Sequence, residues 1–204
     1  MPRDAKIATA DDICQIRVSL MGLEPPIWRR LLVPADMNLK QLHQVLQVAM
    51  GWEDYHMHDF RIGKQRFGEP DPMERYLVGC RTYSEVSARL CEFLGRKGAK
   101  AIYVYDFGDE WHHQIVVEKV LAREPDGVYP RCLDGERHGP PEDCGGIAGY
   151  FNILESYFGT DPGEREAAME WIGEGFDPQA FSIEDVNRKL ARLQRRRRKA
   201  ASGD

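Results

Sequence analysis

The sequence has no long apolar run. No stretch of its 204 residues approaches the roughly 18 consecutive apolar residues of a transmembrane helix. The opening residues, MPRDAKIATADD, contain no apolar segment of the kind found in secretory signal peptides. With 42% hydrophobic and 30% charged residues, the composition is typical of a soluble globular protein. We therefore expect a cytoplasmic protein with no membrane partner.

Cysteines are few and widely spaced, and they include no Cys-x-x-Cys pair. Their number is odd, so in a cytosolic protein we expect free thiols and no disulfide framework. A zinc site at Cys132, His138 and Cys144 is a minor alternative, because their spacing is not standard for zinc. The five cysteines are Cys14, Cys80, Cys91, Cys132 and Cys144.

The common nucleotide-binding and catalytic motifs are also absent. There is no P-loop, no dinucleotide fingerprint and no complete nucleophile–base pair. Residues 106–108 spell Asp-Phe-Gly, the metal-binding triplet of protein kinases. A kinase also needs a glycine-rich loop and an HRD loop, which this chain lacks, so we exclude that class.

The net charge is unevenly distributed along the chain. The net charge is −5; RRRRK at 195–199 contributes +5 and Asp204 −1, which leaves −9 on residues 1–194. An acidic body repels nucleic acid, whereas a basic tail attracts it. We expect 195–204 to be a disordered basic tail that is either simply solvated or contacts nucleic-acid phosphates. The contacting side chains would be Arg195, Arg196, Arg197, Arg198 and Lys199.

Hydrophobic periodicity predicts an α+β fold. Alternation from residue 12 and the β-rich run 27–34 predict a hairpin, residues 39–50 an amphipathic helix, and residues 56–62 a strand that turns back. This order favours a mixed, mainly antiparallel sheet of β-grasp-like ββαββ topology, with a further hairpin and C-terminal helices. We expect a loose N-terminus over 1–11 and one domain over 12–194, helical from about 147 to 194. Segments 68–83 and 123–146 are predicted to be irregular.

The densest stretch is YVYDFGDEWHH, residues 103–113. Gly108 favours a turn, so we expect a β-hairpin with Trp111 and His113 on one face and His112 on the other. Adjacent strand residues cannot share a face, and His112 and His113 are therefore no chelating pair. Two interpretations remain open: a structural hairpin, or a polar site at its end.

The segment PPEDCGG, residues 140–146, precedes a predicted helix. Its carboxylates suit a helix N-terminus, where they would cap the helix; Cys144 is alternatively a reactive thiol. Its glycines offer backbone N–H groups, so we expect the hairpin end to meet this segment in one cleft. The candidate cleft residues are Asp106, Asp109, Trp111, His113, Glu142, Asp143, Cys144, Gly145 and Gly146.

A second candidate site is the His-Met-His run at 56–58. His56 and His58 are two residues apart on a predicted strand and would share a face, which suits metal binding. No third ligand is evident nearby, and no strong metal or cofactor motif occurs elsewhere. The cofactor is therefore left unassigned.

Five ordered stretches resemble the Ri-plasmid ORF-three-like family over about residues 12–190. They are QIRVSLMGLEPPIWRRLLVP, LKQLHQVLQVAMGWEDYHMHDF, YVYDFGDEWHHQIVVEKVL, YPRCLDGERHGPPEDCGG and FDPQAFSIEDVN. The resemblance implies a single α+β domain without an established activity, encoded on plasmids or chromosomes and sometimes carried as a passenger of insertion sequences. Some transposon relatives carry a resolvase-like label, but this chain has no recombinase-like residue set.

We interpret the chain as a non-enzymatic binding or adaptor module for a protein or small ligand. The absence of a catalytic motif supports this, as do aromatic residues expected on the surface: Trp28, Trp52, Tyr55 and Trp111. Two alternatives stay open. One is a metal-dependent or hydrolytic enzyme that uses the His, Asp and Glu residues above. The other is a nucleic-acid-binding accessory factor of a mobile element.

Overall fold

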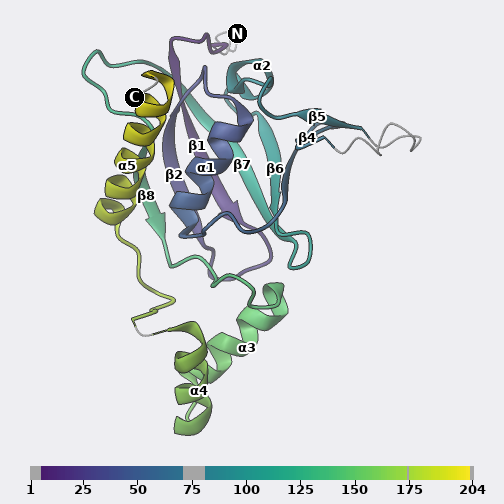
Figure 1. Cartoon of the computed structure of the whole chain (residues 1–204), viewed down its shortest axis with the longest axis vertical. Coiled ribbons are helices and arrows are strands. Elements are labelled where there is room, and N and C mark those ends of the chain that lie inside the picture. Colours follow the sequence, from purple (N-terminus) through teal and green to yellow (C-terminus); the bar gives the residue numbers. More distant parts are fainter. Residues whose placement is uncertain (1–5, 71–80, 174, 203–204) are drawn as a thin grey trace, which may run out of the picture.

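The fold is built on one open sheet (Figure 1). The computed structural model describes residues 6–70, 81–173 and 175–202. In these residues eight strands follow the order β5-β4-β3-β6-β7-β1-β2-β8, antiparallel except for the parallel pair β4–β5. The strands are β1 (Asp12–Leu20), β2 (Trp28–Pro34), β3 (His58–Ile62), β4 (Gln65–Gly68), β5 (Thr82–Ser84), β6 (Lys100–Tyr105), β7 (Trp111–Ala122) and β8 (Arg131–Glu136).

Helices cover one face of the sheet and extend from one end of it (Figure 1). Helix α1 lies across the sheet, α5 runs beside β8, and α3 and α4 project beyond the sheet. None of the described helices has both the length and the apolar character that a membrane crossing requires. The helices are α1 (Leu39–Met50), α2 (Leu90–Leu94), α3 (Gly146–Phe158), α4 (Pro162–Ile172) and α5 (Ile183–Ser202).

Helix α1 begins and ends at residues suited to those positions. Asn38 accepts a hydrogen bond from the Gln41 N–H, and the Gln41 side chain accepts one from the Asn38 N–H, which forms a capping box. Gly51 ends the helix at φ 91°, a left-handed conformation that glycine adopts without a Cβ clash. These two signals fix the helix at the length predicted from residues 39–50.

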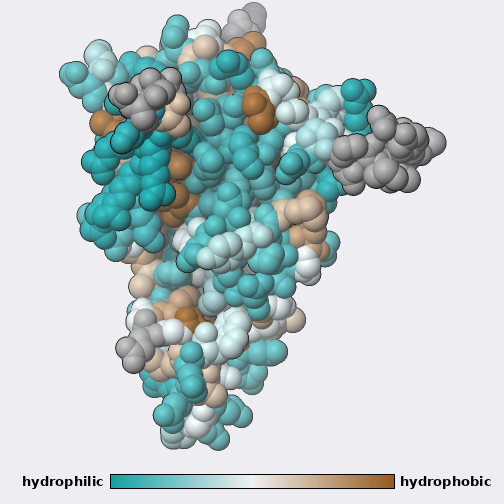
Figure 2. Space-filling model, in the orientation of Figure 1, coloured by the Kyte–Doolittle hydropathy of each residue, from teal (hydrophilic) through white to brown (hydrophobic). Residues whose placement is uncertain are grey.

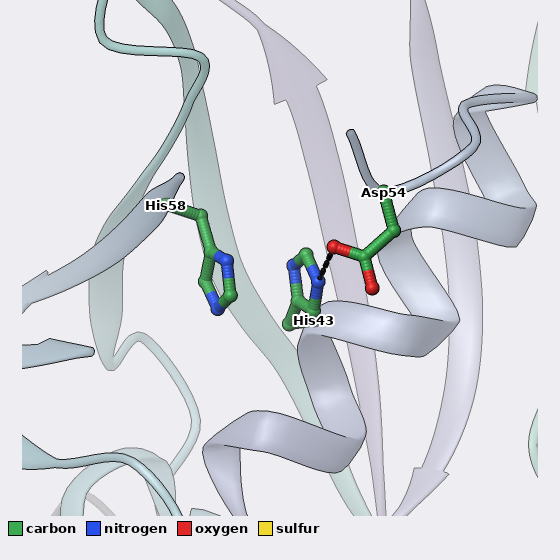
Figure 3. Close-up of side chains that lie close together, drawn as sticks. All are labelled: His43, Asp54 and His58. Carbon is green, nitrogen blue, oxygen red and sulfur yellow. Dashed lines mark hydrogen bonds and ion pairs between the residues drawn. The ribbon is translucent and has the colours of Figure 1, made fainter. Parts of the chain in front are cut away.

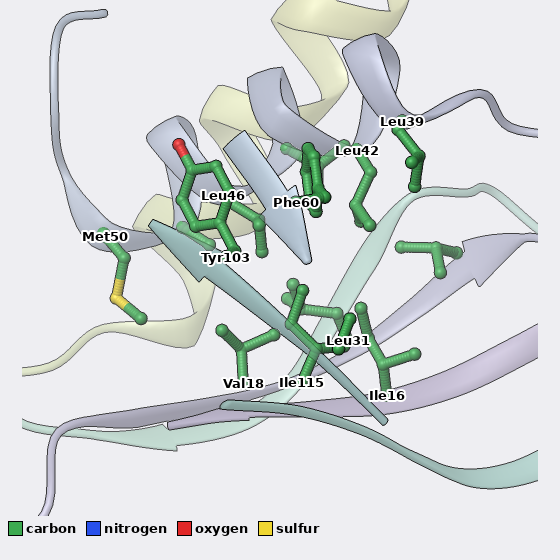
Figure 4. Close-up of a cluster of buried hydrophobic side chains, with 14 of the residues drawn as sticks. Ile16, Val18, Leu31, Leu39, Leu42, Leu46, Met50, Phe60, Tyr103 and Ile115 are labelled. Atoms are coloured by element: carbon green, nitrogen blue, oxygen red, sulfur yellow. The ribbon is translucent and has the colours of Figure 1, made fainter. Parts of the chain in front are cut away.

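The core lies between α1 and the sheet (Figure 4). Leu42 and Leu46 of α1 point at Ile16, Leu31 and Ile115 of the sheet, and all five are at most 1% exposed. The alternation of β1 and β2 supplies one apolar face of the sheet, which the apolar side of α1 covers. Burial of this kind is the main favourable contribution to folding.

The α+β class and the mixed, mainly antiparallel sheet are confirmed. Strands β6 and β7 form the predicted hairpin, in which Tyr103 pairs with His113 and Tyr105 with Trp111. The β-grasp-like ββαββ arrangement is not confirmed. The β3–β4 hairpin joins the sheet through β6, and the β6–β7 hairpin separates it from β1. A single domain over 12–194 stays a prediction.

Two segments expected to be irregular contain strands. Strand β5 begins at Thr82, near the end of 68–83, and pairs with β4; strand β8 lies within 123–146 and pairs with β2. Residues 71–80, including Cys80, lie outside the described residues. Both segments are rich in glycine and proline, which is typical of loops. The pairing of such short edge strands depends on neighbours far away in the sequence, so local composition does not predict them.

The basic C-terminal run is helical, so the prediction of a disordered tail is wrong for residues 195–202. Helix α5 continues to Ser202, and the half-buried Arg197 donates to the backbone oxygen of Gln41 at 2.7 Å and to Oε1 of Gln44. A run of five cations is typical of a solvated tail. The sequence alone does not reveal that Arg197 in this run packs on α1. Residues 203–204 lie outside the described part.

Leu46→Ala should lower the free energy of unfolding by about 2–5 kcal/mol, because it leaves a cavity beneath α1. Leu46 is 1% exposed. Chemical denaturation measures the change, and Lys64→Ala, in the exposed β3–β4 turn, is the control. Unfolding midpoints that agree for Leu46→Ala and the wild type would contradict this packing.

Arg197→Ala should destabilise the protein by about 1–2 kcal/mol, because two α1 acceptors lose a charged hydrogen-bond donor. Arg198→Ala removes the same side chain from the exposed side of α5 and should change stability little. Thermal unfolding of both variants gives the comparison. Equal melting temperatures would show that α5 is not anchored through Arg197.

Candidate functional site

Three loops meet at the end of the sheet near the start of α3. They are the loop after α1, the β6–β7 turn and the segment before α3. Glu142 joins them: its Oε1 accepts the Glu53 N–H at 2.9 Å and the Tyr105 O–H at 3.1 Å. Burial and the adjacent Glu142 carboxylate raise the pKa of Tyr105, so the phenol stays protonated and donates this bond.

The turn and the pre-helix segment also contact each other directly. Asp109 Oδ2 accepts the Gly145 N–H at 3.1 Å, and the Asp109 backbone oxygen would lie 2.7 Å from a Cβ on Gly146. Gly146 also has φ 66°, so both its conformation and this close approach require glycine. The hairpin end and the PPEDCGG segment therefore lie in contact, as predicted.

The side chain of His56 lies among three carboxylates at this junction. Its Nε2 is 3.1 Å from Asp143 Oδ1, 3.6 Å from Asp106 Oδ2 and 4.0 Å from Glu142 Oε2. These four residues are called the His56 cluster below. The other oxygen of Asp106, Oδ1, accepts the Gly108 and Asp109 N–H groups at 2.9 and 3.3 Å, which orients Oδ2 toward His56.

His56 Nε2 is a buried atom without a hydrogen bond. Asp143 Oδ1 is near enough, but the direction of the ring nitrogen does not meet it. The nitrogen therefore lies within 4.0 Å of three carboxylates and is hydrogen-bonded to none of them. An unsatisfied buried nitrogen costs free energy, and in a native protein it calls for a ligand, a bound water or a change of rotamer.

The spacing of the cluster matches that of ligands around a small cation. A metal with bonds of about 2.1 Å places adjacent ligand atoms about 3.0 Å apart in octahedral geometry and about 3.4 Å apart in tetrahedral geometry. The ligand atoms of His56, Asp106 and Asp143 all lie within 4.8 Å of one another, and two of the distances to Nε2 are 3.1 and 3.6 Å. Small side-chain movements would bring all three onto one ion.

A second histidine, His43 of α1, is hydrogen-bonded to Asp54 (Figure 3) and belongs to a closed hydrogen-bond network. Its Nε2 lies 2.7 Å from Asp54 Oδ1 and its Nδ1 2.8 Å from the Tyr103 hydroxyl. Because the carboxylate only accepts, Nε2 carries the proton and Nδ1 accepts from Tyr103. Gln47 completes the network by donating to the Tyr103 oxygen at 3.0 Å and accepting the Asp54 N–H at 2.9 Å.

His58 stacks on His43 and donates to a different carboxylate. The two rings are parallel, with centroids 3.5 Å apart, and His58 Nε2 lies 2.8 Å from Glu85 Oε2. Burial, together with the neighbouring His58, lowers the pKa of His43 to about 4, so His43 is neutral. Parallel rings direct their nitrogen lone pairs alongside one another, so His43, Asp54 and His58 do not converge on one ion even though they lie close together.

A cleft of about 610 Å³ opens beside both histidine groups. His56 and His58 line it, and Phe107 of the β6–β7 turn contributes to one wall. Of the His56 cluster only His56 lines this cleft, and none of the residues predicted for the cleft between the hairpin end and PPEDCGG is among its lining residues. It is lined by Lys40, Asp54, Tyr55, His56, Met57, His58, Asp59, Arg66, Gly68, Glu69, Pro70, Thr82 and Phe107.

His56 and His58 do not form the predicted pair. Strand β3 begins only at His58, so the alternation expected from His56 onward does not hold. His56 turns toward Asp106 and Asp143, whereas His58 turns toward Glu85. The groups that approach His56 are carboxylates from loops distant in the chain, which the sequence around residues 56–58 does not reveal.

Trp111 and His113 share a face as predicted, but that face is the core and not the cleft. They are 1% and 0% exposed, and His113 packs edge-on against Trp52. Burial lowers the pKa of His113 to about 3, so it is neutral and has no access to solvent. Trp52 is also buried, with its indole N–H donated to the Pro140 oxygen, so the expectation of surface-exposed Trp52 and Trp111 is wrong.

The environment of Cys144 disfavours a reactive thiolate. It is buried, and burial together with nearby Asp109 raises its pKa to about 12. The expected capping of α3 by carboxylates is wrong too, because Gly145 occupies the N-cap without a side-chain bond while Glu142 and Asp143 face His56. Cys132 and His138 do not group with Cys144, so the described residues contain no such zinc site.

Sequence reasoning missed the contributions of His43, Asp54 and Tyr105. His43 falls on a helix at a core position, which hides its polar role. Asp54 has φ 64°, and Asp106 and Asp143 also adopt positive φ. Such backbone conformations occur in tight loops, and the hydrophobic periodicity of the sequence does not predict them. Only the placement of the three loops reveals the cluster.

Comparisons with known proteins agree on one family. The family model described as "Plasmid pRiA4b ORF-3-like protein" matches residues 12–185. The Sinorhizobium fredii protein "Uncharacterized protein y4hQ" is 37% identical over 183 residues, which is 87% of this chain and 90% of that protein. A crystal structure titled "Protein of Unknown Function MM3350", from Methanosarcina mazei, aligns with TM-score 0.77 and 35% identity, covering 87% of this chain and 98% of the other.

Stability should fall as the pH drops below 6.5, because His43 and His113 have folded pKa values of about 4 and about 3. The unfolded chain then binds protons that the folded chain does not. Above pH 6.5 these two histidines do not make stability depend on pH. Below it, each one lowers the free energy of unfolding by up to roughly 1.4 kcal/mol per pH unit. Urea unfolding across pH should show a smaller slope in His113→Gln than in His112→Gln, a matched variant on the opposite face. Equal slopes would contradict a neutral, buried His113.

Proposed function

Because the chain belongs to the plasmid pRiA4b ORF-3-like family, whose relatives compared above are described without a function, we propose a function from the site itself. The protein is a non-enzymatic binding module, and the ligand at the His56 cluster is a divalent first-row metal ion. The observation that carries this proposal is the buried Nε2 of His56, which has no hydrogen bond and lies 3.1, 3.6 and 4.0 Å from three carboxylates.

The charge balance of the cluster supports a cation. Asp106, Glu142 and Asp143 approach one imidazole, and Asp109 lies next to them in the same turn. Among the ion pairs of the described residues, these three carboxylates have only His56 as a partner, and no lysine or arginine pairs with them. Carboxylates this close repel one another, and a divalent ion would replace that repulsion with attraction.

The donor set narrows the choice of ion. Carboxylate oxygens suit Mg²⁺ and Mn²⁺, whereas imidazole suits Zn²⁺ and other first-row transition metals. One imidazole with two or three carboxylates therefore favours Mn²⁺ or Zn²⁺ over Mg²⁺. Water from the cleft would complete the coordination, because His56 lines that cleft.

The burial of Cys144 and His113 favours a binding protein over an enzyme. Cys144 is buried with a raised pKa, and His113 is sealed in the core, so neither supplies a nucleophile or base at the cluster. A metal-dependent hydrolase is the second candidate, favoured by the cleft of about 610 Å³ beside His56. Metal-dependent cleavage of a chromogenic ester that is lost in Asp106→Asn would select the hydrolase.

Mn²⁺ titration followed by electron paramagnetic resonance should reveal one bound ion per chain. Asp106→Asn keeps the shape of a ligand but removes its charge, and we expect it to weaken binding at least tenfold. Asp109→Asn is the matched control from the same turn. Its amide oxygen can still accept the Gly145 N–H, and Asp109 is not one of the clustered ligands, so the affinity should stay within about twofold.

Two results would overturn the metal proposal. One is the absence of saturable Mn²⁺ and Zn²⁺ binding in protein purified without a histidine tag. The other is an equal loss of affinity in Asp106→Asn and Asp109→Asn, which would indicate non-specific attraction to an acidic surface. Circular dichroism spectra that match the wild type would show that both variants are folded.

A further inference from the structure

The outer side of α5 carries a continuous positive surface on an acidic protein. The helix holds eight lysines and arginines and no carboxylate between residues 188 and 199, while the whole chain has a net charge of −5. Figure 2 shows hydrophilic side chains along this side of the molecule. The arginines Arg188, Arg192, Arg195 and Arg196 are all exposed and are called the α5 basic face below.

These arginines occupy one side of the helix. Their spacing of i, i+4, i+7 and i+8 places them as neighbours, with successive turns about 6 Å apart along the axis. Like charges at these spacings destabilise a helix. A preference for cations in the last helical turn does not explain the pattern, because it begins three turns earlier.

Intramolecular ion pairs leave most of this face unused. Arg188 pairs with Asp185 at 2.5 Å, but no ion pair among the described residues involves Arg192, Arg195 or Arg196. An acidic protein has many carboxylates with which to pair them. Keeping three adjacent arginines away from those carboxylates leaves them available to an external anion.

The helix is fixed in place by its other side. Val186 and Leu190 are buried in the core, and the Asn187 side chain exchanges two hydrogen bonds with the Cys132 backbone, at 2.7 and 2.9 Å. Gln194 donates to the Tyr129 oxygen at 2.6 Å, and Arg197 is bound to α1. The positive side chains therefore stand on a rigid support with a fixed orientation.

We propose that the α5 basic face binds the phosphate backbone of nucleic acid. Arginine forks match phosphate oxygens in a bidentate manner, and a row of arginines along one side of a helix suits a polymer that carries one phosphate per nucleotide. No aromatic residue interleaves the basic run, so the recognition is of backbone and not of base sequence. This surface is separate from the His56 cluster and does not depend on the metal proposal.

Fluorescence anisotropy with labelled duplex DNA over a series of salt concentrations tests the proposal. Each phosphate contact contributes about −0.9 to the slope of log K against log salt. The triple variant Arg192→Gln, Arg195→Gln, Arg196→Gln should therefore lower the magnitude of the slope by about 2–3. The control Lys64→Gln, Lys97→Gln, Lys119→Gln changes the net charge equally at exposed positions elsewhere, and should keep the wild-type slope.

Parallel measurements with duplex RNA and with lipid vesicles identify which phosphate-containing partner is bound. Duplex RNA that binds as tightly as duplex DNA, with the same loss in the α5 variant, would support recognition of the backbone alone; tighter binding of one duplex would assign the partner to that nucleic acid. Three results would overturn the proposal: no DNA or RNA binding at low salt, equal slopes for the two triple variants, or binding to phosphatidylserine vesicles without binding to either duplex.

Discussion

The carboxylate of Glu142 holds the candidate site together. One of its oxygens accepts hydrogen bonds from the loop after α1 and from Tyr105 at the end of β6, and the other faces His56. Three segments far apart in the sequence are thereby fixed around one imidazole. Trp52 strengthens the same junction by donating to Pro140 and stacking on Tyr105. The position of every ligand in the cluster depends on this junction.

Helix α1 connects the two functional surfaces that we infer. It carries His43 and Gln47, which orient Asp54 at the edge of the cleft. Its other side receives Arg197 and so fixes α5. One helix therefore fixes both the loop that leads into the His56 cluster and the helix that carries the basic face.

Much of the fold follows from local patterns, whereas the site does not. Alternation in residues 12–20, the Asn38 and Gly51 helix signals and the turn at Gly108 each act within a few residues, and each predicted its element. The strand order depends on long-range pairing, so the β-grasp-like topology went beyond what local patterns support. The His56 cluster joins residues 50 and 87 positions apart, at backbone conformations that no periodicity reveals.

X-ray absorption at the manganese edge, on protein loaded with one equivalent of Mn²⁺, tests the central claim most directly. The account predicts oxygen and nitrogen ligands at about 2.1–2.2 Å with the outer-shell scattering of a single imidazole. A sulfur ligand, or scattering from two imidazoles, would contradict it. The first would assign the metal to cysteine, and the second to the stacked pair His43 and His58.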